Sequence, residues 1–209
     1  MPKPVEQYAR LLLEWNRTVN LTGARTMDAV EAHIADAHRL LEVTWNGVTN
    51  VIDIGSGGGL PAVPLALRLP AVQFSLLEAN ARKCAFLMHV AATLGMRNIQ
   101  VLIGRAEDLA REPELREHFD RAISRAVAQP PILLELALPF VRTGGDLLAE
   151  VSELDPASLA GVARLLGGGP PRLRRGPTDK DFTLEVEKVA PTPPAYPRRV
   201  GVPNRRPLA

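Results

Sequence analysis

Residues 53–59 read DIGSGGG and lie between a short apolar run, VIDI at 51–54, and a helical pattern that begins near Pro61. Glycines at such a junction let the backbone approach a ligand closely, and the N-terminus of the following helix offers unpaired N–H groups. The spacing differs from the dinucleotide-binding fingerprint, whose third glycine would stand where this chain has Leu60. A tight turn without a ligand is the alternative, although four glycines in five residues weaken a fold unless close approach requires them.

The segments around this loop alternate between strand and helix patterns, which predicts a doubly wound α/β sheet of mostly parallel strands. Further strands are expected in four apolar runs, at 74–79, 99–104, 119–124 and 146–151. Helices are expected at 80–95, 130–141 and 156–166, and two more precede the loop, the second at about 27–44. The segments 172–176 and 182–190 are typical of a closing antiparallel pair.

Charge is distributed unevenly along the chain. The 209 residues carry 25 basic and 23 acidic side chains, which gives a net charge of +2 and a pI of about 9.0. Residues 1–170 hold 16 basic and 19 acidic side chains, whereas residues 171–209 hold nine and four. The basic pI therefore belongs to the C-terminal part, which indicates a polyanionic partner.

Several classes of protein are excluded by what the chain lacks. A lone cysteine, Cys84, rules out an internal disulfide and a cysteine-based metal site, and no His, Asp or Glu spacing typical of metal ligands appears. No apolar run reaches the ~18 residues of a membrane span, and the N-terminal sequence does not read as a signal peptide. We therefore expect a cytoplasmic protein with no metal and no membrane partner, and a monomer as the default.

The glycine loop has the pattern D-x-G-x-G-x-G, which resembles the first motif of class I S-adenosylmethionine-dependent methyltransferases. In those enzymes the glycines pack against the methionine part of the cofactor. Glu78 ends the second strand, 23 residues after Gly55, where a carboxylate can accept both ribose hydroxyl protons. The third strand is followed by RAED at 105–108, where these enzymes bind adenine. Because all three features end consecutive strands, we expect them to share one crevice.

The methyl acceptor has to be inferred from residues that are missing. Methylation of a pyrimidine C5 needs a nucleophilic cysteine, but Cys84 lies in a helical pattern and is expected in the core. Methylation of an exocyclic amine usually comes with an Asn/Asp-Pro-Pro-aromatic loop after the fourth strand, where this chain has SRAV at 124–127. A ring nitrogen such as guanine N7 needs no proton removed, so positioning alone can supply up to ~7–11 kcal/mol. The sequence is compatible with N7 chemistry.

Six segments together resemble the bacterial small-subunit rRNA guanine-N7 methyltransferases, the RsmG (formerly GidB) family. They are EWNRTVNLTG (14–23), HIADAH (33–38), DIGSGGGLPAVPLA (53–66), RAED (105–108), FDRAISRAVA (119–128) and YPRRVGVPNRRPL (196–208). The resemblance implies a Rossmann-like fold and S-adenosylmethionine-dependent methylation of N7 of guanine 527 in 16S rRNA. S-adenosylhomocysteine would be the product, and either naked 16S rRNA or the 30S subunit would be the partner.

The motifs and the resemblance together imply a set of site residues. Those expected to bind the cofactor are Asp53, Gly55, Gly57, Leu60, Glu78, Ala79, Ala106, Glu107 and Arg125. Arg125 is also the candidate for positioning the guanine. His33 and Asp36 are three residues apart and can share one helix face, so they are further catalytic candidates, with a surface or capping pair as the alternative.

The resemblance also implies RNA-binding residues, and it has one departure. The candidates are Asn20, Arg198, Arg199, Arg205 and Arg206, and Asn20 is expected to brace the helical extension at the rim of the active site. After the fifth strand the family usually has a Lys-Gly pair, whereas this chain has EV at 150–151. The basic contact expected there is lost, replaced by other basic residues, or offset along the strand.

Three parts are expected along the chain. They are an N-terminal helical extension at 1–48, a cofactor-binding methyltransferase domain at 49–190 and a basic, proline-rich tail without regular structure at 191–209. Two other functions are left open beside the rRNA methyltransferase. One is a small-molecule methyltransferase, against which the basic tail argues, and the other is a non-catalytic ribosome-assembly or RNA-binding factor, against which the intact cofactor motifs argue.

Overall fold

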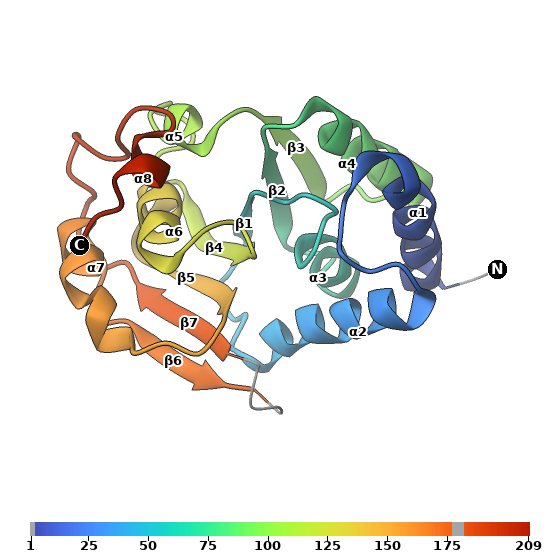
Figure 1. Cartoon of the computed structure of the whole chain (residues 1–209), viewed down its shortest axis with the longest axis horizontal. Helices are drawn as coiled ribbons and strands as arrows, with labels where there is room; N and C mark the ends of the chain where they lie inside the picture. The colour runs from blue at the N-terminus through green and yellow to red at the C-terminus, as the bar shows by residue number, and fades with distance from the viewer. Residues whose placement is uncertain (1–2, 177–181) are drawn as a thin grey trace.

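A mixed seven-stranded sheet lies at the centre of the computed structural model, which describes residues 3–176 and 182–209 (Figure 1). Its strands are β1 (Asn50–Ile54), β2 (Gln73–Glu78), β3 (Ile99–Ile103), β4 (Phe119–Arg125), β5 (Val141–Val151), β6 (Arg172–Arg175) and β7 (Phe182–Glu187). Their order is β3-β2-β1-β4-β5-β7-β6; β1 to β5 are parallel, and β7 is antiparallel to both of its neighbours. This confirms the expected fold class.

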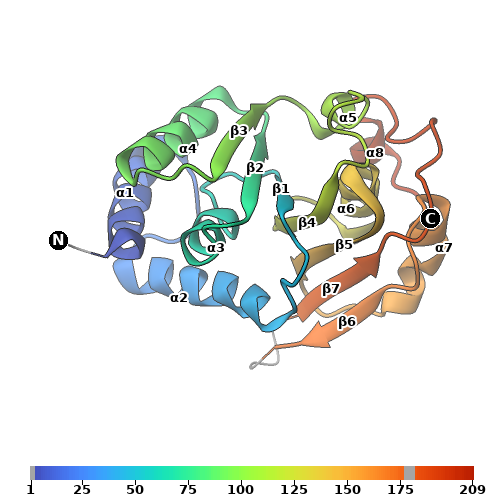
Figure 2. The same ribbon diagram turned by 180° about the vertical axis from the view of Figure 1, so that it is seen from behind.

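Helices cover both faces of the sheet (Figures 1 and 2). The α-helices are α1 (Pro4–Val19), α2 (Met27–His38), α3 (Ala62–Arg68), α4 (Ala81–Thr93), α5 (Ala106–Leu109), α6 (Pro130–Ala137), α7 (Ala160–Leu165) and α8 (Val202–Arg205). Short 3-10 helices are η1 (Arg39–Glu42), η2 (Leu138–Phe140) and η3 (Pro156–Leu159). None of the helices within the described residues is long and apolar enough to span a membrane.

Alternation along the strands divides the core into two clusters. On β1, Val51 packs in the cluster beneath α1 to α4, whereas Ile52 and Ile54 pack in the cluster beneath α5 to α7. The strand order reverses between β1 and β4, so their carboxyl ends lie at a topological switch point, where ligands bind in open α/β sheets. The fold therefore places the loops after β1 and β4 at the expected ligand-binding edge.

Several expected boundaries differ from the structure. The fifth strand begins at Val141 rather than at residue 146, and the helix expected at 130–141 ends at Ala137. The second helix ends at His38 and continues as the 3-10 turn η1, whereas it was expected to reach residue 44. The C-terminal segment contains the short helix α8, although its prolines argued against regular structure; Pro203 is tolerated because it stands in the first turn. Residues 1–2 of the expected extension and 177–181 of the expected methyltransferase domain lie outside the described residues.

Candidate functional site

The end of β4 at Arg125 and the loop 126–128 that follows it separate three cavities at the carboxyl edge of the sheet. Cavity A has a volume of about 290 Å³ and lies between this loop and the ends of β2 and β3. Cavity B, about 310 Å³, lies between the loop, the glycine loop and α2, and shares Gly55, Lys83 and Ala126 with cavity A. Cavity C, about 430 Å³, lies on the side of β5 and shares Arg125 and Ala126 with cavity B. Cavities A and B therefore suit one elongated ligand, with cavity C adjoining it.

The glycine loop has backbone angles and clearances that require glycine. Gly55 and Gly57 have φ values of +68° and +54°, in the left-handed region that disfavours side chains. A Cβ atom on Gly55 would lie 2.7 Å from Cγ2 of Val127. The loops after β1 and β4 can therefore pack this closely only because residue 55 has no side chain. Leu60 lines cavity B at the end of the loop. The backbone here is thus available to a ligand in cavities A and B.

The N-terminal extension rests directly on the glycine loop. The buried Tyr8 hydroxyl of α1 donates a 2.7 Å hydrogen bond to the Gly58 carbonyl. The buried Asn16 fixes the turn after α1, because its amide nitrogen donates to the Thr22 and Ala24 carbonyls and its oxygen accepts from two backbone N–H groups. Asn20 instead ends α1 in a left-handed conformation with φ 52°, and it is exposed. The bracing role expected of Asn20 therefore falls to Asn16.

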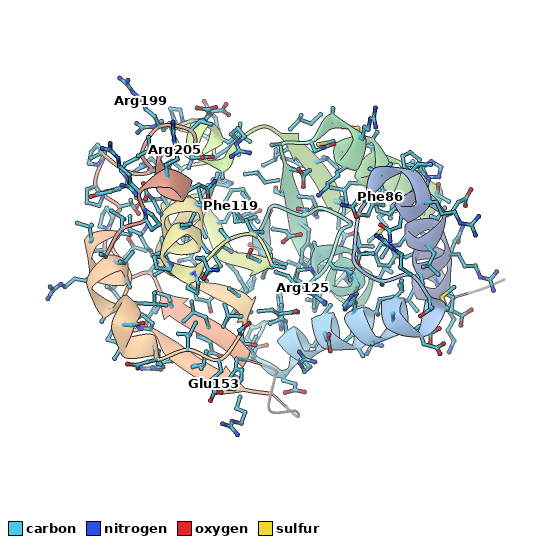
Figure 3. The ribbon with its side chains drawn as sticks, viewed as in Figure 1. Phe86, Phe119, Arg125, Glu153, Arg199 and Arg205 are labelled. Carbon is cyan, nitrogen blue, oxygen red and sulfur yellow. The ribbon has the colours of Figure 1, made fainter. Side chains whose placement is uncertain are left out.

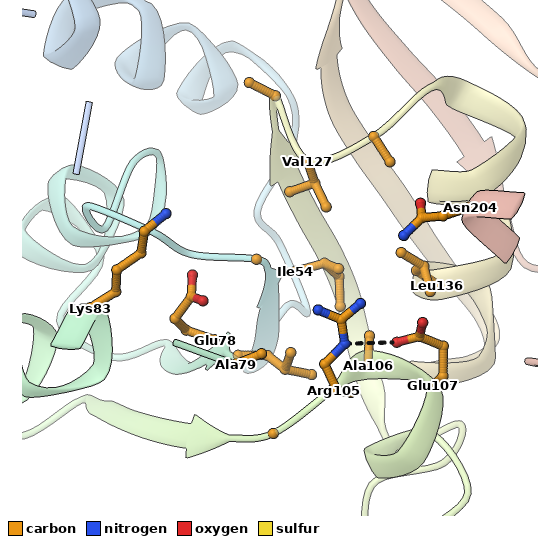
Figure 4. Close-up of a pocket in the computed structure, with 15 residues that line it drawn as sticks. Ile54, Glu78, Ala79, Lys83, Arg105, Ala106, Glu107, Val127, Leu136 and Asn204 are labelled. Carbon is orange, nitrogen blue, oxygen red and sulfur yellow. Dashed lines mark ion pairs between the residues drawn. The ribbon is translucent and has the colours of Figure 1, made fainter. Parts of the chain in front are cut away.

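Glu78 and Ala79 line cavity A where β2 ends (Figure 4). The Glu78 carboxylate accepts hydrogen bonds from the backbone N–H of Gly57 at 3.0 Å and of Asn80 at 2.8 Å. Asn80 is also the N-cap of α4, since its side chain accepts from the amides of the first turn. The carboxylate thus ties β2 to the glycine loop and still borders the cavity, as a ribose-binding group would.

Ala106 and Glu107 also line cavity A, beyond the end of β3. The Glu107 side chain is 2% exposed, and its Oε1 accepts a 3.0 Å hydrogen bond from the backbone N–H of Gly201 in the C-terminal segment. Its Oε2 lies 3.6 Å from Nε of Arg105 (Figure 4). The carboxylate expected to meet adenine is therefore engaged with the chain itself.

Arg125 connects the other two catalytic candidates, His33 and Asp36. Its Nη1 donates to the His33 carbonyl at 3.2 Å, and its Nη2 lies 2.5 Å from His33 Nδ1 and 3.7 Å from Oδ2 of Asp36. Nε lies 3.3 Å from Oε2 of Glu150, on the neighbouring strand β5. Burial and then the Arg125 charge lower the pKa of His33, so its ring is neutral and Nδ1 can accept from Arg125. The structure therefore brings His33, Asp36 and Arg125 together, with Glu150 as an unforeseen fourth member.

Asp53 lies at the end of β1 and is 1% exposed. Neither of its carboxylate oxygens has a hydrogen-bond partner among the described residues, and it is not one of the residues that line cavities A, B and C. Burial is the main reason why its pKa is raised well above the usual range, and the neighbouring carboxylates of Glu150 and Glu78 add to the effect. Asp53 thus lies behind the glycine loop, and the raised pKa favours its neutral form.

The four C-terminal arginines differ in their surroundings, and Figure 3 shows the labelled Arg199 projecting from the surface. Arg198 forms a bidentate ion pair with Glu135, whose side chain is fully buried in α6; the shortest contact is 2.6 Å. Arg199, Arg205 and Arg206 are exposed. Three of the four are therefore available to a polyanion, whereas Arg198 anchors the segment to the domain. A signal for this was present, since Glu135 is the one acid in the apolar run ILLELALPF at 132–140.

Two further residues of the site were missed from the sequence. Asn204 of α8 lines cavity A, and Glu150 of β5 lines cavity C. Within residues 3–176 and 182–209, no three His, Cys, Asp or Glu side chains are placed to hold a metal ion. The donor set as a whole has carboxylates at the ends of β1, β2 and β3 and open glycine backbone between them, which fits a nucleoside carrying positive charge.

A family model described as rRNA small subunit methyltransferase G matches residues 2–154. Two relatives named ribosomal RNA small subunit methyltransferase G come from Moorella thermoacetica, at 39% identity over 98% of this chain and 89% of the relative, and from Deinococcus deserti, at 40% identity over 98% and 88%.

Solved structures resemble the chain in fold. M. jannaschii TYW2 in complex with AdoMet has a TM-score of 0.56 at 19% identity, and the match covers 76% of this chain and 77% of that one. The S-adenosylmethionine-dependent methyltransferase SibL in its apo form has a TM-score of 0.61 at 15% identity, covering 90% and 70%. At these identities the likeness establishes a class I methyltransferase fold.

Proposed function

The chain belongs to the rRNA small subunit methyltransferase G family, and we propose that it methylates N7 of guanine 527 in 16S rRNA with S-adenosylmethionine as the methyl donor. The observation that carries this proposal is the arrangement of the cavities. An elongated pair, A and B, runs along the glycine loop and meets cavity C at Arg125. A methyl donor in cavities A and B and a guanine base in cavity C would then meet at Arg125. The reaction would take place in the cytoplasm, on 16S rRNA or on the 30S subunit.

The residues around cavities A and B fit the cofactor by their chemistry. Glu78 would accept the ribose hydroxyl protons, and the backbone of Ala106 and Glu107 would border the adenine. Gly55, Gly57 and Leu60 would border the methionine part, with Ala79 completing the wall near the ribose. When bound, S-adenosylmethionine supplies an electrophilic methyl group on a sulfonium sulfur. Asp53 lies behind the loop that would hold this cation, and a bound sulfonium would favour the ionised form of its buried carboxyl group, whose pKa burial raises.

The Arg125–Glu150 pair would read the guanine in cavity C. The Watson–Crick edge of guanine offers an acceptor at O6 and donors at N1 and N2, so it matches a guanidinium donor beside a carboxylate with two acceptor oxygens. Nε of Arg125 and Oε2 of Glu150 are 3.3 Å apart, close enough to contact adjacent positions of one base edge. Because N7 neighbours O6, a base with O6 at Arg125 turns N7 toward cavity B.

His33 and Asp36 position Arg125, and no general base is needed. N7 carries a free lone pair, so no proton leaves before attack, and the Nδ1 lone pair of His33 is already directed at Arg125. Asp36 lies within 4 Å of both Arg125 and His33, and Arg39 contacts its other oxygen. Holding the two reactants in line is then the main contribution of the protein.

The exposed tail arginines would contact the RNA backbone. Arg199, Arg205 and Arg206 lie on one exposed segment and carry charge that phosphates can neutralise. Arg198 is held by the buried Glu135 and would contribute by fixing this segment. We therefore assign the electrostatic contact to three arginines and place Asn20 at the rim formed by the turn after α1.

The decisive experiment is methyl transfer from tritiated S-adenosylmethionine. Unmethylated 30S subunits, naked 16S rRNA and a pool of small metabolites are incubated separately with the protein, and the labelled nucleotide is mapped. The proposal expects one methyl group at N7 of guanine 527. Label at another nucleotide, or in the metabolites alone, would overturn the proposed acceptor. Cofactor binding without transfer to any substrate would instead support a non-catalytic assembly factor.

A further inference from the structure

Asn204 of the C-terminal segment lines cavity A, which the proposed function assigns to the adenosine end of the cofactor, and the nearby Gly201 N–H donates to Glu107, another lining residue. We propose that the side-chain amide of Asn204 reads the 6-amino edge of the adenine, and that Glu107 is the positioning residue that holds this segment against the cavity. The inference rests on the proposed function, because it takes S-adenosylmethionine as the ligand. It assigns to the tail a part in cofactor binding beside its part in RNA binding.

The first support is that Glu107 is already engaged. Its Oε1 accepts the Gly201 N–H at 3.0 Å and its Oε2 faces Arg105 at 3.6 Å, while the side chain is almost fully buried. A carboxylate fixed in this way holds its orientation, and it offers acceptors only. The adenine edge presents an amino donor beside a ring-nitrogen acceptor, so pairing with both positions needs another side chain at this end of the cavity that can also donate.

Asn204 is placed to be that residue. Figure 4 shows its amide directed into cavity A, on the opposite side from Glu78. An asparagine amide offers one acceptor and two donors, and it can pair in a bidentate manner with the amino group of adenine and the adjacent ring nitrogen. A ribose at Glu78 and an adenine edge at Asn204 would then span the cavity from one wall to the other.

The second support is that the segment is fixed to the domain by charge-assisted hydrogen bonds. Arg111 and Arg116 donate to the carbonyls of Pro197, Tyr196 and Thr192, and the Arg116 bond to Thr192 measures 2.7 Å. Arg198 is paired with the buried Glu135, and α8 packs against α6. A segment anchored on both sides of Gly201 can hold a ligand-reading side chain in place, which a solvated tail could not.

The test compares two ligands across variants. Isothermal titration calorimetry of the free full-length protein measures the dissociation constants of S-adenosylhomocysteine and of its 6-deamino analogue, which lacks the adenine amino group. Wild type should bind the analogue about fivefold to tenfold more weakly, because one ligand hydrogen bond is lost. Asn204→Leu should bind both ligands within about twofold of each other, since the partner of that bond is absent.

Control variants distinguish a loss of adenine recognition from a general disturbance of the binding site. Arg199→Leu alters an exposed residue of the same segment and should keep the wild-type preference. Glu107→Gln retains an acceptor for Gly201 N–H and should also keep it, whereas Glu107→Ala should lose it. An undiminished preference in Asn204→Leu would overturn the inference and leave the proposed function intact. Failure of wild type to bind S-adenosylhomocysteine at all would instead overturn the proposed function.

Discussion

Nε of Arg125 lies 3.3 Å from Oε2 of Glu150 because the two residues are register neighbours at the carboxyl ends of β4 and β5. The ion pair borders cavity C, where the proposed acceptor base would enter. The family pattern has a lysine–glycine pair after the fifth strand, whereas Glu150 and Val151 are the last two residues of β5 in this chain. A carboxylate at this place suits the N–H edge of a base rather than a phosphate.

Glu150→Gln should impair methyl transfer more than cofactor binding. Glutamine keeps one acceptor but replaces the other with an N–H₂ donor that opposes the guanine edge. Single-turnover transfer to 30S subunits should fall about 10-fold to 100-fold, in line with a lost charge-assisted hydrogen bond. The affinity for S-adenosylhomocysteine should stay within about twofold of wild type. Glu153→Gln is the matched control, because its side chain is 70% exposed and borders the same cavity. Equal rates in both variants would contradict guanine reading by Glu150.

The rate of methyl transfer should decline at acidic pH because His33 becomes protonated. The neutral ring accepts from Arg125, and both burial and the guanidinium lower the pKa of His33 below its ordinary value of about 6.5. Below that lowered pKa, protonation removes the acceptor and sets two cations side by side, so Arg125 is displaced. The folded state also takes up this proton less readily than the unfolded chain, so the free energy of unfolding attributable to His33 falls as the pH drops through the unfolded value of about 6.5.

The check is a pH profile of the single-turnover rate between pH 5 and pH 8. Wild type should lose activity on the acid side, whereas His33→Asn should have a lower plateau and a flatter acid limb, because the amide oxygen accepts at every pH. His118→Asn is the control, since His118 is exposed and borders none of the cavities described. An unchanged acid limb in His33→Asn would assign the pH dependence to another group.

The sheet could be predicted from local patterns because its strands are short apolar runs bounded by turn residues. The glycine loop could also be predicted locally, because its glycines by themselves indicate a backbone that a ligand can approach closely. Gly55 and Glu78 could be placed in one site because parallel strands bring their carboxyl ends to one edge. The contact between His33 and Arg125, 92 positions apart, was not predicted, since the two were only separate candidates for the same site.

The C-terminal segment could not be read in the same way, because its structure depends on partners distant in sequence. Its prolines and arginines indicate an extended basic tail. The one acid in the apolar run 132–140 signals that Glu135 needs a partner, but nothing local shows that the partner is Arg198 or that Glu107 accepts from the Gly201 N–H. The choice between Asn16 and Asn20 is of the same kind, because both stand near one turn and only the packing of α1 decides which is buried.

Gly55→Ala should weaken cofactor binding in addition to straining the backbone, which is left-handed at this residue. Both Gly55 and Gly95 have φ near +65°, at +68° and +64°, so alanine at either position should destabilise the fold by about 1–2 kcal/mol. Only at Gly55 does the new Cβ meet a neighbour, 2.7 Å from Val127, whereas nothing lies within 4 Å at Gly95. Gly55→Ala should therefore displace the loop between cavities A and B.

Urea unfolding and calorimetry with S-adenosylhomocysteine separate the two effects. Both variants should lose similar stability, but only Gly55→Ala should lose more than about tenfold in affinity, equivalent to about 1.4 kcal/mol. Matching affinities in the two variants would show that the contact with Val127 does not shape the ligand site.

Lys188→Met should destabilise the fold through the attachment of the C-terminal segment. Lys188 is fully buried, and its Nζ donates to Glu117, to the carbonyls of Leu138 and Val141, and to the Thr192 hydroxyl, all within 3.0 Å. Methionine fills a similar volume but leaves these acceptors without their donor. Because Glu117 is a quarter exposed, we expect the lower end of the range for a broken buried pair, about 3 kcal/mol of the free energy of unfolding. Urea denaturation measures this loss, and Lys3→Met, at an exposed position, should change it by less than about 0.5 kcal/mol. Losses of similar size in the two variants would show that the buried ammonium does not hold the segment in place.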